Sequence, residues 1–128
     1  MKDPRWLTVE ETIAIHGEQL AIFGGSSGIR DQGLLESALG RPLNRFRYED
    51  GDLAELAAAY AYGLSRNHAF VDGNKRIAFA AMMVFLRING VRFAPPAEEA
   101  TLIMIDLAAG EVEEAGLVRW IRDRWPPR

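Results

Sequence analysis

The chain has 128 residues, the usual size of one domain, and 48% of them are hydrophobic, which is enough for a buried core without a disulfide or a metal. Cysteine is absent, and this excludes disulfides, thiolate metal sites and a cysteine nucleophile. The 15 basic and 18 acidic side chains give a net charge of -3, which argues against direct nucleic-acid binding through a broadly basic surface.

The sequence predicts neither export nor a membrane span. Its start, residues 1–5, carries charges and a proline and is not followed by the apolar core of a signal peptide. The longest apolar run, residues 77–86, is ten residues long, whereas a membrane-spanning helix needs about 20. We therefore expect one cytoplasmic domain over residues 1–128, without membrane contact.

Apolar residues recur at helical spacing along almost the whole chain. Thr8, followed three positions later by Glu11, has the form of a capping box, so a first helix is predicted to begin there and to end near residue 23. The predicted apolar face of this helix carries Val9, Ile13, Leu20 and Phe23. His16 falls on the same face and is interpreted as a partly buried histidine with a hydrogen-bond partner.

A short second helix is predicted to begin at its cap, Asp31. Gly40 and Pro42 are expected to end it, because glycine often follows a helix and proline lacks the N–H for the next hydrogen bond. A separate short helical piece is expected over residues 42–47. The glycine-rich residues 24–28 before this helix lack the G-K-[ST] ending of a Walker loop. They are interpreted as a mobile flap or connector, with positioning of the target as the less favoured alternative.

Four longer helices are predicted over residues 52–67, 75–89, 97–109 and 113–125. The helix over 75–89 is apolar on every side between its two arginines, which is typical of a helix surrounded by others. The predicted fold class is therefore all-α: a single-domain bundle of about six helices around a buried central helix at about residues 75–89.

The start of that central helix has the features of a phosphate-binding site. Gly73 and Asn74 tolerate unusual backbone angles and stand where unpaired N–H groups and the positive end of the helix dipole attract anions. Lys75 and Arg76 add cations in the first turn, where each costs a few tenths to about 1 kcal/mol unless an anion is held there. This local stability cost indicates function.

The residues just before the helix supply the groups for a transfer reaction. Histidine accepts a proton near neutral pH, so His68 is a candidate general base. Asp72 is a hard oxygen ligand of the kind that binds Mg²⁺ together with substrate phosphates. Phe70 and Val71 are apolar and are expected to anchor the loop on the core. Together with the cations, these groups predict phosphate-group transfer to a hydroxyl.

Residues 68–76 read HAFVDGNKR, which resembles the signature of the Fic/Doc superfamily, H-x-F-x-[D/E]-G-N-[G/K]-R, with the lysine of its Doc branch. Residues 24–25, 28–31 and 34–38 are also similar to the upstream region of Doc-like proteins. The resemblance implies a Fic-type helical fold and a toxin of the death-on-curing type. Such a toxin transfers the γ-phosphate of ATP to a threonine of elongation factor Tu and so blocks translation.

The resemblance also implies a role for each residue of the motif. His68 would deprotonate the acceptor hydroxyl, and Asp72 would hold Mg²⁺. Residues 73–76 would bind the phosphates of ATP, and Lys75 and Arg76 would act in catalysis as well. Because the sequence lacks S/T-x-x-x-E-[G/N], the inhibitory motif of self-restrained Fic proteins, we expect restraint by a separate chain, a Phd-like antitoxin.

Three alternatives remain open from the sequence. Most Fic relatives transfer AMP rather than phosphate, so protein adenylylation is one of them. A helical interaction module without catalysis is the second. Direct nucleic-acid binding by the arginine-rich residues 41–48 is the third, and the net charge disfavours it. Arg66, beside the motif, is interpreted either as a phosphate contact or as a solvated side chain.

Overall fold

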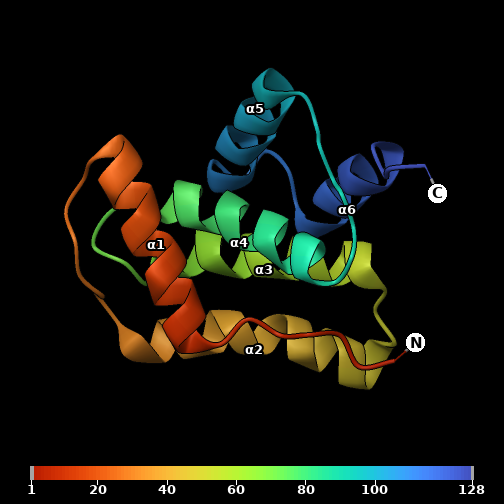
Figure 1. The fold of residues 1–128 in the computed structure, drawn as a ribbon, viewed down its shortest axis with the longest axis horizontal. Helices are drawn as coiled ribbons and strands as arrows, with labels where there is room; N and C mark the ends of the chain where they lie inside the picture. The colour runs from red at the N-terminus through yellow and green to blue at the C-terminus, as the bar shows by residue number, and fades with distance from the viewer. Residues whose placement is uncertain (1, 128) are drawn as a thin grey trace.

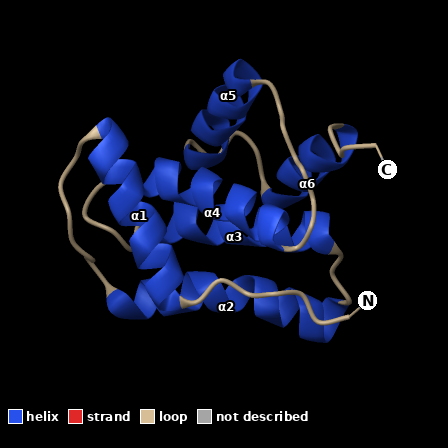
Figure 2. Cartoon of the chain, viewed as in Figure 1, coloured by secondary structure: helices blue, strands red, loops and turns tan. Residues whose placement is uncertain are grey.

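A computed structural model describes residues 2–127, and all its regular elements are helices (Figures 1 and 2). In chain order they are α1 (Val9–Phe23), α2 (Gln32–Glu49), α3 (Leu53–Asn67), α4 (Asn74–Ile88), α5 (Ala97–Ala108) and α6 (Glu114–Asp123). Helices α3 and α4 lie side by side at the centre, with α2 below them in Figure 1, α1 across one end, and α5 and α6 above. The predicted all-α architecture is thus confirmed.

None of these helices combines the length and the apolar character that crossing a membrane requires, as judged over residues 2–127.

Three helices begin at the caps that the sequence predicts. Thr8 and the Glu11 side chain form a reciprocal capping box at the start of α1. Asp52 and Glu55 do the same at α3, and the Asp31 side chain accepts the N–H of the third residue of α2. These local hydrogen bonds satisfy backbone donors that a helix start otherwise leaves unpaired.

The prediction for α2 is wrong in one respect. The sequence predicts a helix that ends at Gly40 and Pro42, followed by a separate helical piece. Helix α2 runs unbroken through both residues, and Pro42 is buried. A proline inside a helix costs about 3 kcal/mol, because it removes one hydrogen bond and crowds the carbonyl four residues earlier. That carbonyl belongs to Ala38, which packs closely against Gly63 of α3. Packing of α2 on α3 therefore outweighs the local preference of proline.

The centre of the bundle is a pair of helices rather than α4 alone. Within residues 77–86 of α4 no side chain is exposed, as predicted for a central helix. Helix α3 is buried over even more of its length. Its alanines let α2, α4, α5 and α6 all contact it, and small residues of this kind give a weaker sequence signal than the large apolar ones of α4.

The buried face of α1 differs from the predicted one. Ile13 and Phe23 are exposed, with relative accessibilities of 37% and 64%, whereas Thr12 and His16 are buried. Both polar residues have partners, since the Thr12 hydroxyl donates to the Thr8 carbonyl at 2.8 Å and His16 Nε2 lies 2.7 Å from a carbonyl of the loop before α4. Polar groups that are hydrogen-bonded can be buried at little cost. The pattern of apolar residues alone therefore predicts the wrong buried face for this helix.

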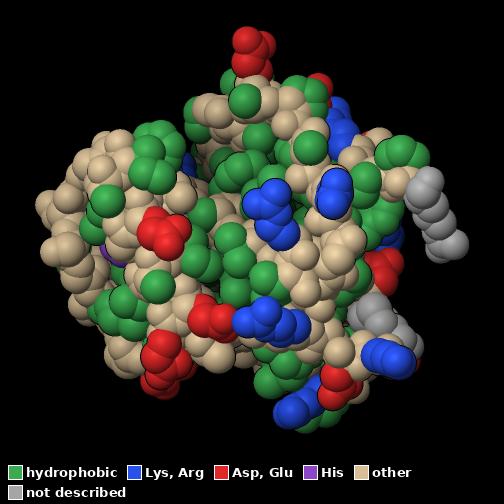
Figure 3. Space-filling view, in the orientation of Figure 1, with side chains coloured by type: hydrophobic (Ala, Val, Ile, Leu, Met, Phe, Trp, Pro, Cys, Tyr) green, Lys and Arg blue, Asp and Glu red, His purple; other side chains and the backbone are tan. Residues whose placement is uncertain are grey.

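The arginine-rich stretch of α2 is largely used inside the fold. Arg41 Nε donates to Glu114 at 2.9 Å, and Arg45 donates both to Glu114 at 2.6 Å and to Glu55 at 2.8 Å. These bonds join α2 to α3 and α6. On the face drawn in Figure 3, the basic side chains stand in separate groups and form no continuous basic block. The stretch therefore gives no support to nucleic-acid binding.

The close approach of α2 and α3 gives a test of the packing. A Cβ on Gly63 would lie 3.2 Å from the Ala38 carbonyl oxygen and 3.3 Å from its Cα. Because these are backbone atoms, Gly63→Ala is expected to lower the free energy of unfolding by about 1–3 kcal/mol, measured by urea denaturation. Gly17→Ala is the control: its Cβ meets nothing within 4 Å, so we expect a gain of about 0.5–1 kcal/mol. Equal stability of the two variants would contradict the packing.

The hydroxyl of Tyr60 gives a test with pH. It is buried on α3 and accepts the Leu7 N–H at 3.0 Å, and burial raises the pKa of Tyr60 from its ordinary 10.0 to about 12. The native state therefore favours the protonated phenol, so this contribution to stability is complete below pH 10 and is lost as the pH rises toward 12. We expect the Tyr60→Phe variant to lack this loss of stability between pH 10 and pH 12, which the wild type shows. At pH 7 it should cost about 1–3 kcal/mol, because the Leu7 N–H loses its acceptor.

Candidate functional site

Two loops meet at one end of the bundle and form the candidate site. The motif loop, residues 68–73, joins α3 to α4, and the connector, residues 24–31, joins α1 to α2 beside it (Figure 1). Ile29 and Phe70 form an antiparallel bridge. Within it the Arg30 N–H donates to the Ala69 carbonyl at 2.7 Å, and the Val71 N–H donates to the Gly28 carbonyl at 3.0 Å. The connector thus pairs with the motif loop through backbone hydrogen bonds.

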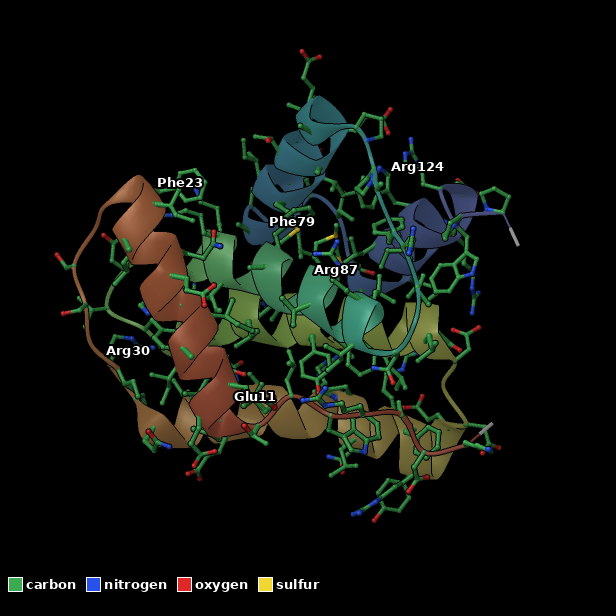
Figure 4. All side chains as sticks on the ribbon, in the orientation of Figure 1. Glu11, Phe23, Arg30, Phe79, Arg87 and Arg124 are labelled. Carbon is green, nitrogen blue, oxygen red and sulfur yellow. The ribbon has the colours of Figure 1, made fainter. Side chains whose placement is uncertain are left out.

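His68 ends α3 with an exposed side chain on a fixed backbone. Its φ of 48° and ψ of 48° lie in the left-handed region, which costs an ordinary residue about 1–2 kcal/mol. The Arg30 side chain holds this conformation, because its Nε donates to the His68 carbonyl at 2.7 Å and its Nη2 donates to the Asn67 carbonyl at 3.1 Å. Figure 4 shows Arg30 on the connector, at the same end of the bundle. The imidazole is accessible to a substrate.

Phe70 anchors the loop, as predicted, but Val71 does not. Phe70 is 2% exposed, whereas Val71 is 55% exposed. The two residues lie in the bridged, extended part of the loop, where successive side chains point to opposite sides. Asn74 adds a second fixation: its Oδ1 accepts the Phe70 N–H at 3.1 Å, and its Nδ2 donates to the Phe70 carbonyl at 3.0 Å. Asn74 therefore braces the loop from inside.

Asp72 is exposed and its carboxylate is held by backbone donors from both loops. Oδ2 accepts the Ser26 N–H at 3.0 Å, and Oδ1 accepts the Gly73 N–H at 2.8 Å. These two hydrogen bonds, together with the nearby Arg76 cation, lower the pKa of Asp72 below its ordinary range, so the group is a carboxylate at neutral pH. Each oxygen retains a lone pair that faces no backbone donor, which fits a metal cation held also by substrate oxygens.

Asp72 is the one acidic group suited to this task at the motif loop. No cluster of three or more metal-ligating side chains occurs in the part of the chain that the structure describes. A single carboxylate is too little for a cation held by protein alone. One carboxylate does fit Mg²⁺, which commonly keeps several waters and binds through one or two carboxylates plus the phosphates of a substrate.

Helix α4 begins without a side-chain cap. Its first flanking residue, Gly73, has a φ of 76° in the left-handed region, so the backbone turns into the helix as only glycine does easily. Uncapped N–H groups and the dipole make such a start a site for anions. Lys75 is exposed in the first turn. Arg76 is half-buried, because its Nη1 donates to the Gly24 carbonyl at 2.9 Å and its guanidinium lies over the Phe23 ring.

The fit between connector and motif loop gives a third test. A Cβ on Gly25, whose φ is +121°, would lie 2.7 Å from Asp72 Oδ2 and 3.1 Å from Arg76 Nη2. We expect Gly25→Ala to move the carboxylate away from the Ser26 N–H, so that amide exchange at Ser26 becomes faster. Gly24→Ala is the matched control, since its φ of +80° imposes similar backbone strain but its Cβ meets nothing within 4 Å. Equal exchange in both variants would show that the close approach is unimportant.

The structure thus places the six predicted site residues, His68 and residues 72–76, on one loop and the helix turn that follows it. His68, Asp72 and Lys75 are exposed there, and Asn74 and Arg76 are partly used to hold the loops together. The outlying Arg66 is exposed and lies over the Tyr62 ring at 5.6 Å. On the loop and the first turn of α4, the side chains of His68, Asp72 and Lys75 are accessible to a substrate.

Sequence reasoning missed the part that the connector plays. Ser26 contributes only its backbone N–H, and Gly25 contributes only the absence of a side chain, so neither leaves a chemical signature. The one available signal is the density of glycines in residues 24–28. The expectation that His16 has a hydrogen-bond partner is confirmed. The side chain is fully rather than partly buried, and its partner, the motif loop, was not foreseen.

Comparisons with known proteins identify the family of the chain. The sequence model of the Fic/DOC family matches residues 6–86. Protein kinase doc of Escherichia phage P1 is 36% identical over 119 residues, which cover 92% of this chain and 94% of that protein. Toxin Doc of Mycolicibacterium smegmatis is 50% identical over 74 residues, which cover 56% of this chain and 57% of that protein. The family match includes the connector, the motif loop and the start of α4, and the chain therefore belongs to the Fic/Doc family.

Proposed function

We propose that this protein is the toxin of a toxin–antitoxin pair and a protein kinase, which transfers the γ-phosphate of ATP to a threonine of elongation factor Tu and thereby blocks translation. The observation that carries the proposal is the meeting of an exposed histidine, a fixed carboxylate and an uncapped, lysine-bearing helix start on one braced loop. The names of the two relatives, a protein kinase and a toxin, support the same function.

The proposed reaction assigns one task to each exposed group. His68 accepts the proton of the threonine hydroxyl while the threonine oxygen forms a bond to the γ-phosphorus of ATP. The bond from that phosphorus to the oxygen that bridges it to the β-phosphate breaks, and ADP is released. Lys75 and the N–H groups at the start of α4 neutralise the charge on the phosphate oxygens. Asp72 would hold Mg²⁺, which would supply further positive charge at the phosphates.

Lys75 favours phosphate transfer over AMP transfer. Its long side chain stands in the first turn of α4 and is exposed, whereas Arg76 is tied to the connector. In the AMP-transferring relatives that the sequence resembles, glycine stands here and leaves room for the α- and β-phosphates. A lysine crowds that space. It therefore favours binding of ATP in the opposite orientation, with the γ-phosphate toward His68.

The experiment that separates these reactions uses purified protein, elongation factor Tu, Mg²⁺ and ATP labelled at either the α- or the γ-phosphate. The proposal predicts that only the γ-label appears on the elongation factor and that ADP accumulates. Transfer of the α-label would instead establish adenylylation. Growth arrest that persists in the His68→Ala variant, without label transfer, would favour an interaction module without catalysis.

The proposal includes a partner that restrains the toxin. We expect a small Phd-like antitoxin, encoded next to this gene and ending in an amphipathic segment. Co-expression with that neighbour should restore growth to cells that the toxin arrests, and the two chains should co-purify. A neighbour that neither binds the toxin nor relieves the arrest would contradict this part of the proposal.

A further inference from the structure

Outside the motif, the buried side chain of His16 contacts the motif loop. His16 of α1 is 3% exposed. Its Nε2 lies 2.7 Å from the carbonyl oxygen of Asp72, 56 positions away in the sequence. Its ring is stacked on the Phe70 ring, with centroids 3.8 Å apart and an angle of 15° between the planes. His16 therefore meets the loop through both a polar and an aromatic contact.

The hydrogen bond identifies a ring nitrogen of His16 that carries a proton. A carbonyl oxygen only accepts, so the proton must be on His16 Nε2. A Cβ on Gly73 would lie 3.5 Å from the same nitrogen, which places the ring in contact range of the loop at Phe70, Asp72 and Gly73. The connector holds the other side of the loop through Ser26 and the bridge to Phe70. The loop is thus clamped between α1 and the connector.

Resting on the proposed function, we propose that His16 is a positioning residue: it holds the backbone at Asp72 from α1, so that the carboxylate and the exposed His68 keep their places around the phosphates. His16 itself cannot reach a substrate, because it is buried beneath the loop. Its effect on the reaction is through geometry. A misplacement of catalytic groups by about 1 Å costs on the order of 100-fold in rate.

Two substitutions separate the contacts that His16 makes. His16→Gln keeps an N–H donor near the position of Nε2 but loses the aromatic ring. His16→Phe keeps a ring to stack on Phe70 but loses the donor. If the hydrogen bond to Asp72 positions the loop, His16→Phe should lower kcat about 10- to 100-fold, and His16→Gln should recover most of that loss. Thr12→Val is the control, since Thr12 is also buried in α1 and its hydroxyl bonds only within the helix.

A second readout does not depend on activity. The amides of Phe70, Val71 and Gly73 are all hydrogen-bonded, to Asn74 of α4, to the connector and within the loop respectively. Hydrogen exchange at these amides, measured by NMR on the full chain, should be faster in His16→Phe than in His16→Gln or Thr12→Val. The thermal midpoint of each variant separates this local effect from loss of the whole fold.

The two readouts distinguish the two proposals. If the wild type transfers no phosphate but His16→Phe loosens the loop, the proposed function fails and the positioning role stands. If the wild type is active and His16→Phe matches Thr12→Val in both kcat and loop exchange, the positioning role is wrong and the proposed function stands. Activity that falls equally in His16→Phe and His16→Gln would also overturn the role of the hydrogen bond.

Discussion

Replacing His68 by asparagine is expected to reduce phosphate transfer by about 10²- to 10⁴-fold, the usual contribution of a general base, with the fold unchanged. The side chain is exposed, so its removal opens no cavity. Asparagine suits the test because it tolerates the left-handed backbone found at this position but does not accept a proton near neutral pH. Initial rates of label transfer from ATP, with circular dichroism as a check of the fold, measure the effect.

A matched control for His68 lies two residues before it in the chain. Arg66 is exposed and rests over the Tyr62 ring, so Arg66→Gln changes the same end of α3 without touching the motif loop. Its rate should stay within a few-fold of the wild type. A His68→Asn variant that transfers phosphate as fast as Arg66→Gln would remove the general base from the proposed mechanism.

Replacing Asp72 by asparagine is expected to have a comparably large effect. The carboxylate is the proposed ligand of Mg²⁺, and an amide offers one oxygen, no charge and weaker binding to a hard cation. The remaining oxygen can accept from either Ser26 or Gly73, but not from both as the carboxylate does. We therefore expect the rate to fall at least 100-fold and the connector to loosen at Ser26.

The dependence on metal concentration separates these two consequences. If Asp72 holds the cation, raising Mg²⁺ should recover part of the activity of Asp72→Asn, and the amide exchange at Ser26 should remain fast. If the residue acts only by fastening the connector, the activity should instead be insensitive to Mg²⁺ and should match that of Gly25→Ala. The second pattern would contradict the assignment of Asp72 as a metal ligand.

Much of the fold was predictable because it depends on contacts within a few residues. The caps at Thr8, Asp31 and Asp52 determine where three helices begin, and a cap involves only its neighbours in the chain. Pro42 shows the limit of such reasoning. Its cost is local, but the packing that outweighs it comes from α3, and no local pattern in α2 records that partner.

The candidate site was predictable to the extent that its residues are contiguous. His68 and Asp72 lie in one short stretch, so their types and spacing were enough to suggest the chemistry. The parts that hold the stretch in place come from elsewhere in the chain. His16 and Ser26 contact the loop across 56 and 46 positions, and one of them acts through its backbone, which the amino-acid type does not reveal.

The mass of elongation factor Tu after incubation with this protein, Mg²⁺ and ATP tests the central proposal most directly. The wild type should add the mass of one phosphate group, localised by fragmentation to a threonine, and His68→Asn should leave the factor unmodified over the same time. Addition of the mass of AMP, or an unmodified factor with the wild type, would contradict the proposed kinase activity.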